Sequence, residues 1–327
     1  WEYVPELNEY YYHYFAKGQV DLNWTNPKVR QEIANMVNWW LDKGVAGFRM
    51  DAIELIGKDL ENNIFANGPK IHDYLRELNE NSFGKKEDSI TVGEGWPTTK
   101  IAIEYSNPEH HEVDMMFNFD LISHIWNNNE LAKFEPNIPN LLEIKEIFKR
   151  WQNDLRGQGW NTLFWENHDL ARCISNFGND RFYRVESAKA LAYMLYFQQG
   201  TPYIYQGQEI GMTNVSWDSI EKYDELNSKA QYKFAIEEGH SPAEAMAFVN
   251  RFSRDNSRTP MQWNDKLNAG FTTGKPWLSL NDNFYSVNVA SEDSDVHSVL
   301  NYYRELMKYR KESKALQNGA FVELLPD

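Results

Sequence analysis

The sequence predicts an α/β protein built on a (β/α)8 barrel, and three observations support that fold class. Helical and strand-like segments alternate along the chain, reactive side chains follow several of the strands, and no glycine-rich phosphate-binding loop is present. Alternation of this kind indicates a parallel sheet, and barrels of this class build their active sites at the C-terminal ends of the strands. An open, doubly wound sheet gathers ligands there too, but the absence of G-x-G-x-x-G and G-x-x-x-x-G-K favours the barrel.

The helices are predicted from apolar residues that recur every three or four positions. The first helix shows the pattern clearly, and Gly44 marks its end because glycine commonly follows the last helical residue. Helices are expected at about residues 28–43, 69–80, 140–154, 184–199 and 295–317.

The strands are predicted from short apolar or alternating runs between these helices. They are expected at about residues 46–50, 90–93, 113–117, 161–165 and 202–205. Four of them lead into polar residues with reactive side chains, namely Asp51, Glu94, Asp169 and Gln206. Residues 208–283 are expected to form a long polar excursion from the barrel.

The first of these strands carries two charged residues, Arg49 and Asp51, among apolar neighbours. Unpaired ions in an apolar interior are costly, so they are retained where they pair or where chemistry needs them. Residues two apart on a strand share one face, so this arginine and aspartate are expected to share a site. Such a pair in a strand is about as often purely structural.

The overall charge bears on the class of partner. The 327 residues carry a formal net charge of −15 and a pI near 5.0, which argues against nucleic acid and against an anionic membrane surface. Aromatic residues make up 15% of the chain, with 12 tryptophans, and their flat rings suit sugar binding as well as core packing. A small oligosaccharide is therefore the expected partner.

Cys173 is the only cysteine, which excludes an intrachain disulfide and a cysteine-based zinc site. No run of residues reaches the roughly 18 consecutive apolar positions of a membrane span. We expect a cytoplasmic location from the lone cysteine. No cofactor and no metal ligand set is predicted from these residues.

Three of the carboxylates fit the chemistry of glycosidic bond cleavage, which needs one ionised and one protonated carboxyl group. Asp51 lies beside Arg49, which should hold it ionised, so it suits the nucleophile. Glu94 follows an apolar strand, an environment that keeps a carboxylic acid protonated and suits a proton donor. Asp169, in "FWENHD", could bind sugar hydroxyls most strongly in the transition state. None of the three is decisive alone.

The motifs that contain these residues resemble those of the α-amylase superfamily, glycoside hydrolase family 13. The resemblance is closest to the branch of oligo-1,6-glucosidases, dextran glucosidases and α-glucosidases, and it covers nearly the whole chain. The matching stretches, in order, are "GFRMDAI", "TVGE", "FWENHD", "GTPYIYQGQEIGMTN" and "RDNSRTPMQW". The resemblance implies a retaining mechanism on a (β/α)8 barrel.

By the pattern of this family, Asp51 is the nucleophile, Glu94 is the general acid/base and Asp169 is the transition-state stabiliser. The resemblance also implies that four other residues orient the nucleophile or bind sugar: Arg49, His168, Arg172 and Arg254.

The family's first three barrel strands have no counterpart here, so roughly strands 4 to 8 are expected in this chain. The resemblance implies three parts: residues 1–20 as the end of an inserted B domain, 21–317 as a partial catalytic barrel, and 318–327 as the start of a C-terminal β domain. The missing remainder of the barrel is an expected partner, because five strands alone leave open edges. A structural calcium site, if there is one, would lie in the missing N-terminal part.

Three residues bear on which glycosidic linkage is accepted. Ala52 follows the expected nucleophile where α-1,6-selective relatives usually carry valine, and Asn227 falls about where many of them carry glutamate. Lys133 instead resembles a lysine of dextran glucosidases that lies on the leaving-group side of the substrate. The choice between α-1,6 and α-1,4 bonds therefore stays open.

The leading hypothesis is an exo-acting, retaining α-glucosidase that releases terminal glucose from short isomalto- or malto-oligosaccharides. A transglucosidase or sucrose isomerase on the same scaffold is the alternative among enzymes. A non-catalytic relative, such as the ancillary ectodomain of an amino-acid transporter, is the alternative from another class, but all three carboxylates that such proteins commonly lose are present here.

Overall fold

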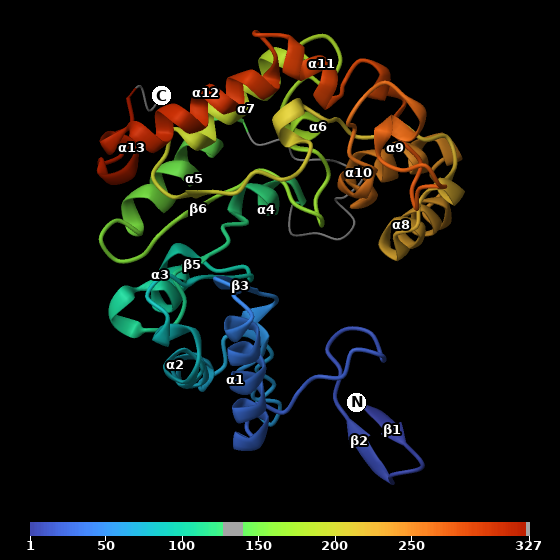
Figure 1. The fold of residues 1–327 in the computed structure, drawn as a ribbon. Helices are drawn as coiled ribbons and strands as arrows, with labels where there is room; N and C mark the ends of the chain where they lie inside the picture. Colours follow the sequence, from blue (N-terminus) through green and yellow to red (C-terminus); the bar gives the residue numbers. More distant parts are fainter. Residues whose placement is uncertain (127–139, 325–327) are drawn as a thin grey trace. The chain divides into compact units, whose positions relative to one another are not determined.

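The structure, a computed structural model, describes residues 1–126 and 140–324 (Figure 1). The chain divides into two compact units. Unit 1 contains residues 1–117 and 154–160, and unit 2 contains residues 118–153 and 161–327.

Unit 1 begins with an antiparallel hairpin of β1 (Glu2–Val4) and β2 (Glu9–Tyr11). A three-stranded parallel sheet follows, in the order β3 (Gly47–Met50), β4 (Ile90–Gly93), β5 (Met115–Met116). The helices of this unit are α1 (Pro27–Asp42), α2 (Ile71–Asn81) and α3 (Thr99–Ser106), each of which precedes one of these strands.

Helix α1 shows why this part of the sequence forms a helix. Asn26 caps it by accepting a hydrogen bond from the Lys28 N–H, and Pro27 takes the first position, where its missing N–H costs nothing. After the helix Gly44 has φ +94°, a conformation that glycine adopts without strain. The buried face of α1 packs with Phe48 and Met50 of β3.

Strand β3 is only half-buried, whereas the sequence suggested a buried strand. Among the described residues it pairs with β4 on one side, so it forms an edge of its sheet. Phe48 and Met50 point toward α1 and α2, in a cluster that includes Val37 and Leu78. Since side chains alternate along a strand, Arg49 is carried on the opposite face.

Unit 2 contains a two-stranded parallel sheet of β6 (Thr162–Leu163) and β7 (Thr201–Pro202). Its helices include α4 (Asp120–Trp126), α5 (Leu141–Asp154), α6 (Cys173–Phe177), α7 (Arg184–Tyr196), α8 (Leu226–Glu237), α9 (Pro242–Phe252), α10 (Asp255–Arg258), α11 (Val289–Ser294), α12 (Val299–Glu312) and α13 (Lys314–Asn318).

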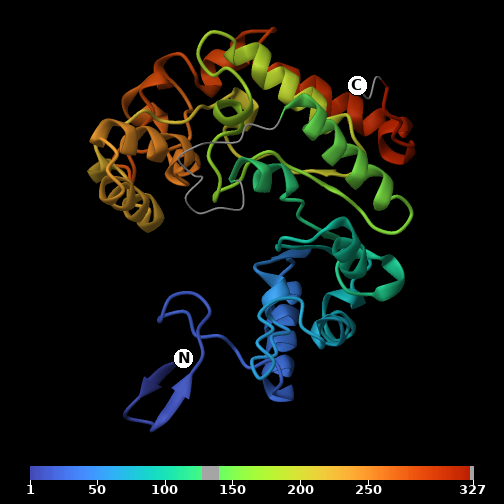
Figure 2. The ribbon, with the colours of Figure 1, turned by 180° about the vertical axis from the view of Figure 1, so that it is seen from behind.

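Helices α7 and α12 lie side by side in both views of the ribbon (Figures 1 and 2). Arg310 of α12 is buried and joins them, because its guanidinium donates hydrogen bonds to the backbone carbonyls of Tyr196, Gln198 and Gly200. These are the carbonyls at the end of α7 and in the turn that leads into β7. One side chain of α12 therefore supplies hydrogen-bond donors to backbone carbonyls at and just beyond the C-terminal end of α7, where carbonyl groups lack partners within the helix.

All five predicted strands are confirmed: β4 has the expected bounds, and the other four are shorter than expected. The predicted polar excursion, residues 208–283, differs most, because it folds into helices α8 to α10 around a core of its own. The tail was expected to start a new strand, but residues 319–324 have no strand assignment. No helix in the described ranges, 1–126 and 140–324, has both the length and the apolar character needed to span a membrane.

Candidate active site

Asp51 and Glu94 come together because of the register of two parallel strands. Met50 of β3 pairs with Gly93 of β4, so the residue that follows each strand leaves the sheet at the same edge. The backbone continues this pairing, since the Glu94 N–H donates to the Met50 carbonyl at 2.8 Å and the Ile53 N–H donates to the Glu94 carbonyl at 2.9 Å. Both carboxylates therefore start from the C-terminal edge of one sheet.

One guanidinium contacts both carboxylates. Arg49 Nη1 lies 2.6 Å from Asp51 Oδ1, and Arg49 Nη2 lies 3.8 Å from Glu94 Oε2. The Ala52 N–H also donates to Glu94 Oε2, at 2.8 Å. The side chain of Asp51 is 76% exposed and that of Glu94 is 19% exposed. Two acids that share a cation thus differ strongly in their access to water.

The turn after β3 holds this arrangement. Ala52 has φ 44°, in the left-handed region, which is uncommon for a residue with a side chain. That conformation turns its N–H toward Glu94. Glu54, in the same turn, accepts a hydrogen bond from the Trp96 N–H at 3.2 Å. Trp96 is 45% exposed, two residues beyond Glu94.

A second cluster of charges lies in unit 2 around Asp169. Its Oδ1 accepts hydrogen bonds from Arg258 Nη2 at 2.7 Å and from Arg254 Nη1 at 3.3 Å. The Nε2 atom of His168 lies 3.4 Å from Asp169 Oδ2. The predicted residues Asp169, His168 and Arg254 are thus brought together, with the exposed His168 at the surface of the cluster.

Arg258 is a member of this cluster that sequence reasoning missed. It makes the shorter of the two arginine contacts to Asp169, and its Nε also donates to the His168 backbone carbonyl at 2.8 Å. Arg254 and Arg258 stand four residues apart across the short helix α10, so their side chains can reach the same carboxylate. The i, i+4 spacing of the two arginines in "RDNSR" was the available signal.

Arg172 lies elsewhere, in the interior of unit 2. Its side chain is 1% exposed and forms a 2.8 Å ion pair with Glu166, which is equally buried. The same guanidinium donates to the Gln206 carbonyl, and Glu166 also accepts the Cys173 N–H. Through these contacts Arg172 packs in the interior of unit 2 and neutralises the buried carboxylate of Glu166. The sugar-binding role that the resemblance implies for Arg172 stays a prediction.

The remaining predicted residues are those expected to influence which glycosidic linkage, and so which leaving group, the site accepts. Asn227 is exposed on the first turn of α8, two residues after Glu225, which forms an ion pair with Arg254 at 3.2 Å. Ala52 adjoins the two carboxylates of unit 1 as described above. Lys133 lies outside the described residues.

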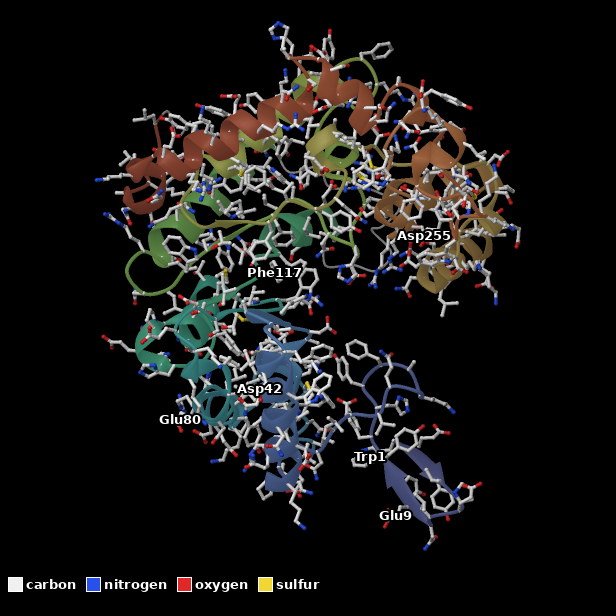
Figure 3. All side chains as sticks on the ribbon, in the orientation of Figure 1. Trp1, Glu9, Asp42, Glu80, Phe117 and Asp255 are labelled. Atoms are coloured by element: carbon white, nitrogen blue, oxygen red, sulfur yellow. The ribbon has the colours of Figure 1, made fainter. Side chains whose placement is uncertain are left out.

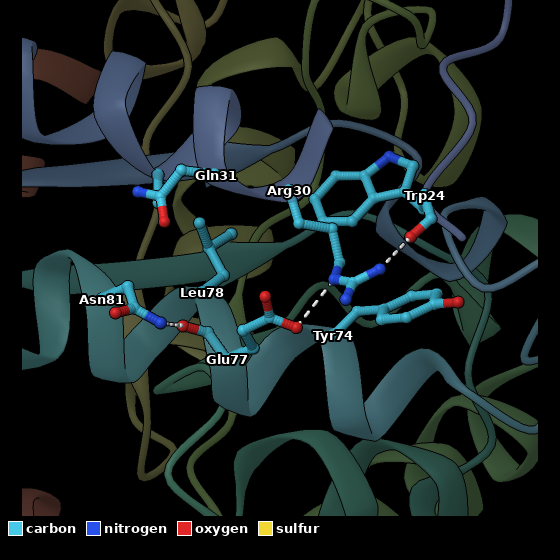
Figure 4. A pocket seen from close by; sticks show the side chains of 8 residues that line it. Trp24, Arg30, Gln31, Tyr74, Glu77, Leu78 and Asn81 are labelled. Atoms are coloured by element: carbon cyan, nitrogen blue, oxygen red, sulfur yellow. Dashed lines mark hydrogen bonds and ion pairs between the residues drawn. The ribbon is translucent and has the colours of Figure 1, made fainter. Parts of the chain in front are cut away.

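The described part of unit 1 includes two cavities of different size. The larger, about 220 Å³, is mostly apolar and has Arg49 and Asp51 in its wall, beside Trp24, Phe48 and Leu78. The smaller, about 10 Å³, is closed by Arg30, which pairs with Glu77 and the Trp24 carbonyl over the ring of Tyr74 (Figure 4). It has room for about one water molecule and no sugar. The described part of the chain contains no group of three or more His, Cys, Asp or Glu side chains placed to hold a metal ion.

Curated relatives resemble the chain over its whole length. It is 44% identical to a glucan 1,6-alpha-glucosidase of Streptococcus pneumoniae, covering 99% of this chain and 61% of that protein. It is 43% identical to an oligo-1,6-glucosidase of Parageobacillus thermoglucosidasius, covering 100% and 61%. The chain thus spans about three fifths of the length of these relatives.

Solved structures of glycoside-processing enzymes also resemble the chain over its whole length. A trehalose-6-phosphate hydrolase of Bacillus licheniformis matches with a TM-score of 0.94 at 39% identity, over all of this chain and 60% of that one. An isomaltulose synthase of Klebsiella matches with a TM-score of 0.90 at 38% identity, over 100% and 61%. These matches confirm the predicted fold class, a (β/α)8 barrel of which the chain carries a part. The model of the alpha amylase catalytic domain matches residues 1–319, and the chain therefore belongs to this family of glycoside hydrolases.

Proposed function

We propose that the protein is a retaining, exo-acting α-glucosidase that removes terminal glucose from short α-linked oligosaccharides. One observation carries the proposal: Arg49 contacts both Asp51 and Glu94, one exposed and one largely shielded from water. A retaining glycosidase needs such a pair, with an ionised carboxylate to attack and a carboxylic acid to donate a proton. The names of the curated relatives support the choice of an α-glucoside as substrate.

In this mechanism Asp51 attacks the anomeric carbon while Glu94 protonates the oxygen of the leaving sugar. The covalent glucosyl-enzyme is then hydrolysed by a water from which Glu94 takes a proton, which restores both groups. Arg49 offsets the negative charge of Asp51 and sets its orientation.

We assign Asp169 to the hydroxyl groups of the reacting sugar. Its Oδ1 atom is held by Arg254 and Arg258, which leaves Oδ2 near His168 available as an acceptor. A carboxylate fixed in this way can bind the distorted sugar of the transition state more strongly than the ground state. His168 is exposed and would add a further hydrogen bond to the same sugar.

A second candidate is a transglucosidase or sucrose isomerase, in which a sugar rather than water captures the glucosyl-enzyme. It is supported by the similarity to the isomaltulose synthase structure. Product analysis with isomaltose, maltose and sucrose separates the candidates, because a hydrolase releases glucose and an isomerase returns a different disaccharide.

The proposal is tested by the substitution Asp51→Asn in the full-length protein. Loss of the nucleophile should lower kcat by a factor on the order of 10⁴ or more. The matched control is Asp42→Asn, an exposed carboxylate at the end of α1, which should leave kcat unchanged. Turnover is measured as glucose released, and the first-formed anomer is read by NMR.

An α-glucose product released first supports retention, and β-glucose would contradict it. Substantial turnover by the Asp51→Asn variant would reject Asp51 as the nucleophile.

We also propose a cytoplasmic location, supported by the free thiol of Cys173, which is buried and has no disulfide partner. Free thiols persist in a reducing compartment. Cell fractionation tests this, and recovery of the protein from the culture medium would contradict it.

A further inference from the structure

Trp277 is an exposed tryptophan whose ring is held in place. It is 65% exposed, yet its indole Nε1 donates a hydrogen bond to Asp224 Oδ2 at 2.7 Å. The next residue, Leu278, is 3% exposed in the core of the excursion, which anchors the backbone at this point. An indole with its N–H occupied presents its apolar face to the solvent, and such a face stacks on the C–H surface of a sugar ring.

Asp224 belongs to a rigid turn. The backbone N–H groups of Asp224 and Glu225 both donate to Asp255 Oδ2, at 2.8 and 3.0 Å. Asp255, which is labelled in Figure 3, is fully buried. The turn that carries the partner of Trp277 is therefore fixed to the first residue of α10.

The same turn reaches the Asp169 cluster through Glu225. The carboxylate of Glu225 accepts hydrogen bonds from Ser228 Oγ at 2.5 Å and from the Arg254 N–H at 3.0 Å. Its other oxygen lies 3.2 Å from Arg254 Nε, and Arg254 in turn donates to Asp169. Asp224 thus holds the exposed indole of Trp277, and the adjacent Glu225 holds Arg254 of the candidate site.

Asp224, the hydrogen-bond partner of Trp277, lies in a stretch of the chain with exposed polar residues. Asn227 is exposed on the first turn of α8, three residues after Asp224, and offers an amide to sugar hydroxyl groups. Asp224 itself is exposed. An aromatic face with a few polar groups placed to fix orientation is the usual composition of a small-molecule site.

From these contacts we propose that Trp277 stacks on a sugar unit of the leaving group and so determines which substrate lengths are preferred. The inference rests on the proposed α-glucosidase function. Trp277 acts as a binding residue: it adds affinity for sugars beyond the reacting glucose and takes no part in bond cleavage.

The test compares two substrates with the full-length protein and its Trp277→Ala variant. α-Glucosyl fluoride has no leaving sugar, whereas isomaltotriose or maltotriose has two. The variant should lose about tenfold in kcat/KM on the trisaccharide and keep its kcat/KM on the fluoride, since one stacking contact is lost. Trp277→Phe, which keeps a ring, should retain most of the preference.

The matched control is Trp39→Ala, which removes an exposed tryptophan of α1 and should leave both values unchanged. An unchanged ratio of trisaccharide to fluoride activity in Trp277→Ala, or an equal loss on both substrates, would overturn the inference while the proposed function stands. Failure of the unsubstituted protein to cleave any of the three α-glucosides would instead overturn the proposed function.

Discussion

At the scale of single residues, Asp51 and Glu94 differ because of what surrounds each carboxylate. Asp51 is open to water and bonded to Arg49, whereas Glu94 is shielded and accepts the backbone N–H of Ala52. The differences in exposure and in hydrogen-bond partners come from the surrounding structure, because both side chains carry the same carboxyl group. One guanidinium and one unusual backbone turn thus place the two carboxylates in unequal surroundings.

The buried pair of Arg172 and Glu166 gives a prediction about stability. Arg172→Met removes the cation and leaves a carboxylate unpaired in the interior, which should lower the free energy of unfolding by about 3–5 kcal/mol. Urea denaturation of the full-length protein measures this. The control is Arg304→Met, whose exposed ion pair with Asp293 should contribute less than about 1 kcal/mol.

This experiment also tests the role that the resemblance implies for Arg172. An Arg172→Met variant that is as stable as the control but has a raised KM would mean that the arginine binds sugar. A destabilised variant with an unchanged KM would mean that it supports the structure.

At the scale of elements, helix α2 is tied to the segment before β5 by a buried carboxylate. Glu112 is buried, with its side chain 0% exposed, and contacts His72 Nδ1 at 2.8 Å and Arg76 Nη1 at 3.1 Å. The hydrogen bond to Glu112 is the main cause that raises the pKa of His72 above its ordinary value. Glu104 raises it further, while burial and Arg76 act in the opposite direction.

The sign of this shift predicts a pH dependence of stability. A histidine with a raised pKa stabilises the fold fully below its unfolded-state pKa, and the contribution is lost as pH rises through the folded-state value. His72→Gln should therefore destabilise the protein more at about pH 5.5, below the ordinary pKa of histidine, than at about pH 9. Denaturant unfolding at both values checks this, and a difference that does not vary with pH would contradict it.

Helices α8 and α9 show which elements a sequence reading misses. Only Ser228 and Ala235 are buried in α8, so no apolar periodicity marks it. Helix α9 did carry a signal, because Ser241 and Glu244 form a reciprocal capping box around Pro242. Applying that rule to "SPAE" would have predicted the start of a helix inside the excursion.

At the scale of the whole molecule, the dominant property is the net charge of −15 at pH 7. Charge repulsion keeps such a protein dispersed near neutral pH and vanishes near its pI of about 5.0. We expect a solubility minimum close to that pH, measured as turbidity of the full-length protein between about pH 4 and pH 8. A minimum above pH 6 would indicate that surface charge is not what keeps the protein in solution.

The sequence alone determined the parallel-strand architecture and the positions of Asp51 and Glu94 directly after β3 and β4, whereas Asp169 lies six residues beyond the end of β6. It could do so because apolar periodicity and the residues that follow each strand are local properties of the chain. The hydrogen bonds across β3 and β4 that bring Asp51 and Glu94 together needed the register of two strands about forty residues apart.

Only the tertiary structure decided which side chains surround Asp169. Arg254 and Arg258 lie 85 and 89 residues away in the chain, and nothing in local spacing connects them to that carboxylate. The same holds for Arg172, for which the resemblance implies sugar binding and which the fold buries against Glu166. Local patterns specify the elements, but contacts between distant residues depend on how those elements pack, and the packing sets the charge and exposure of each site residue.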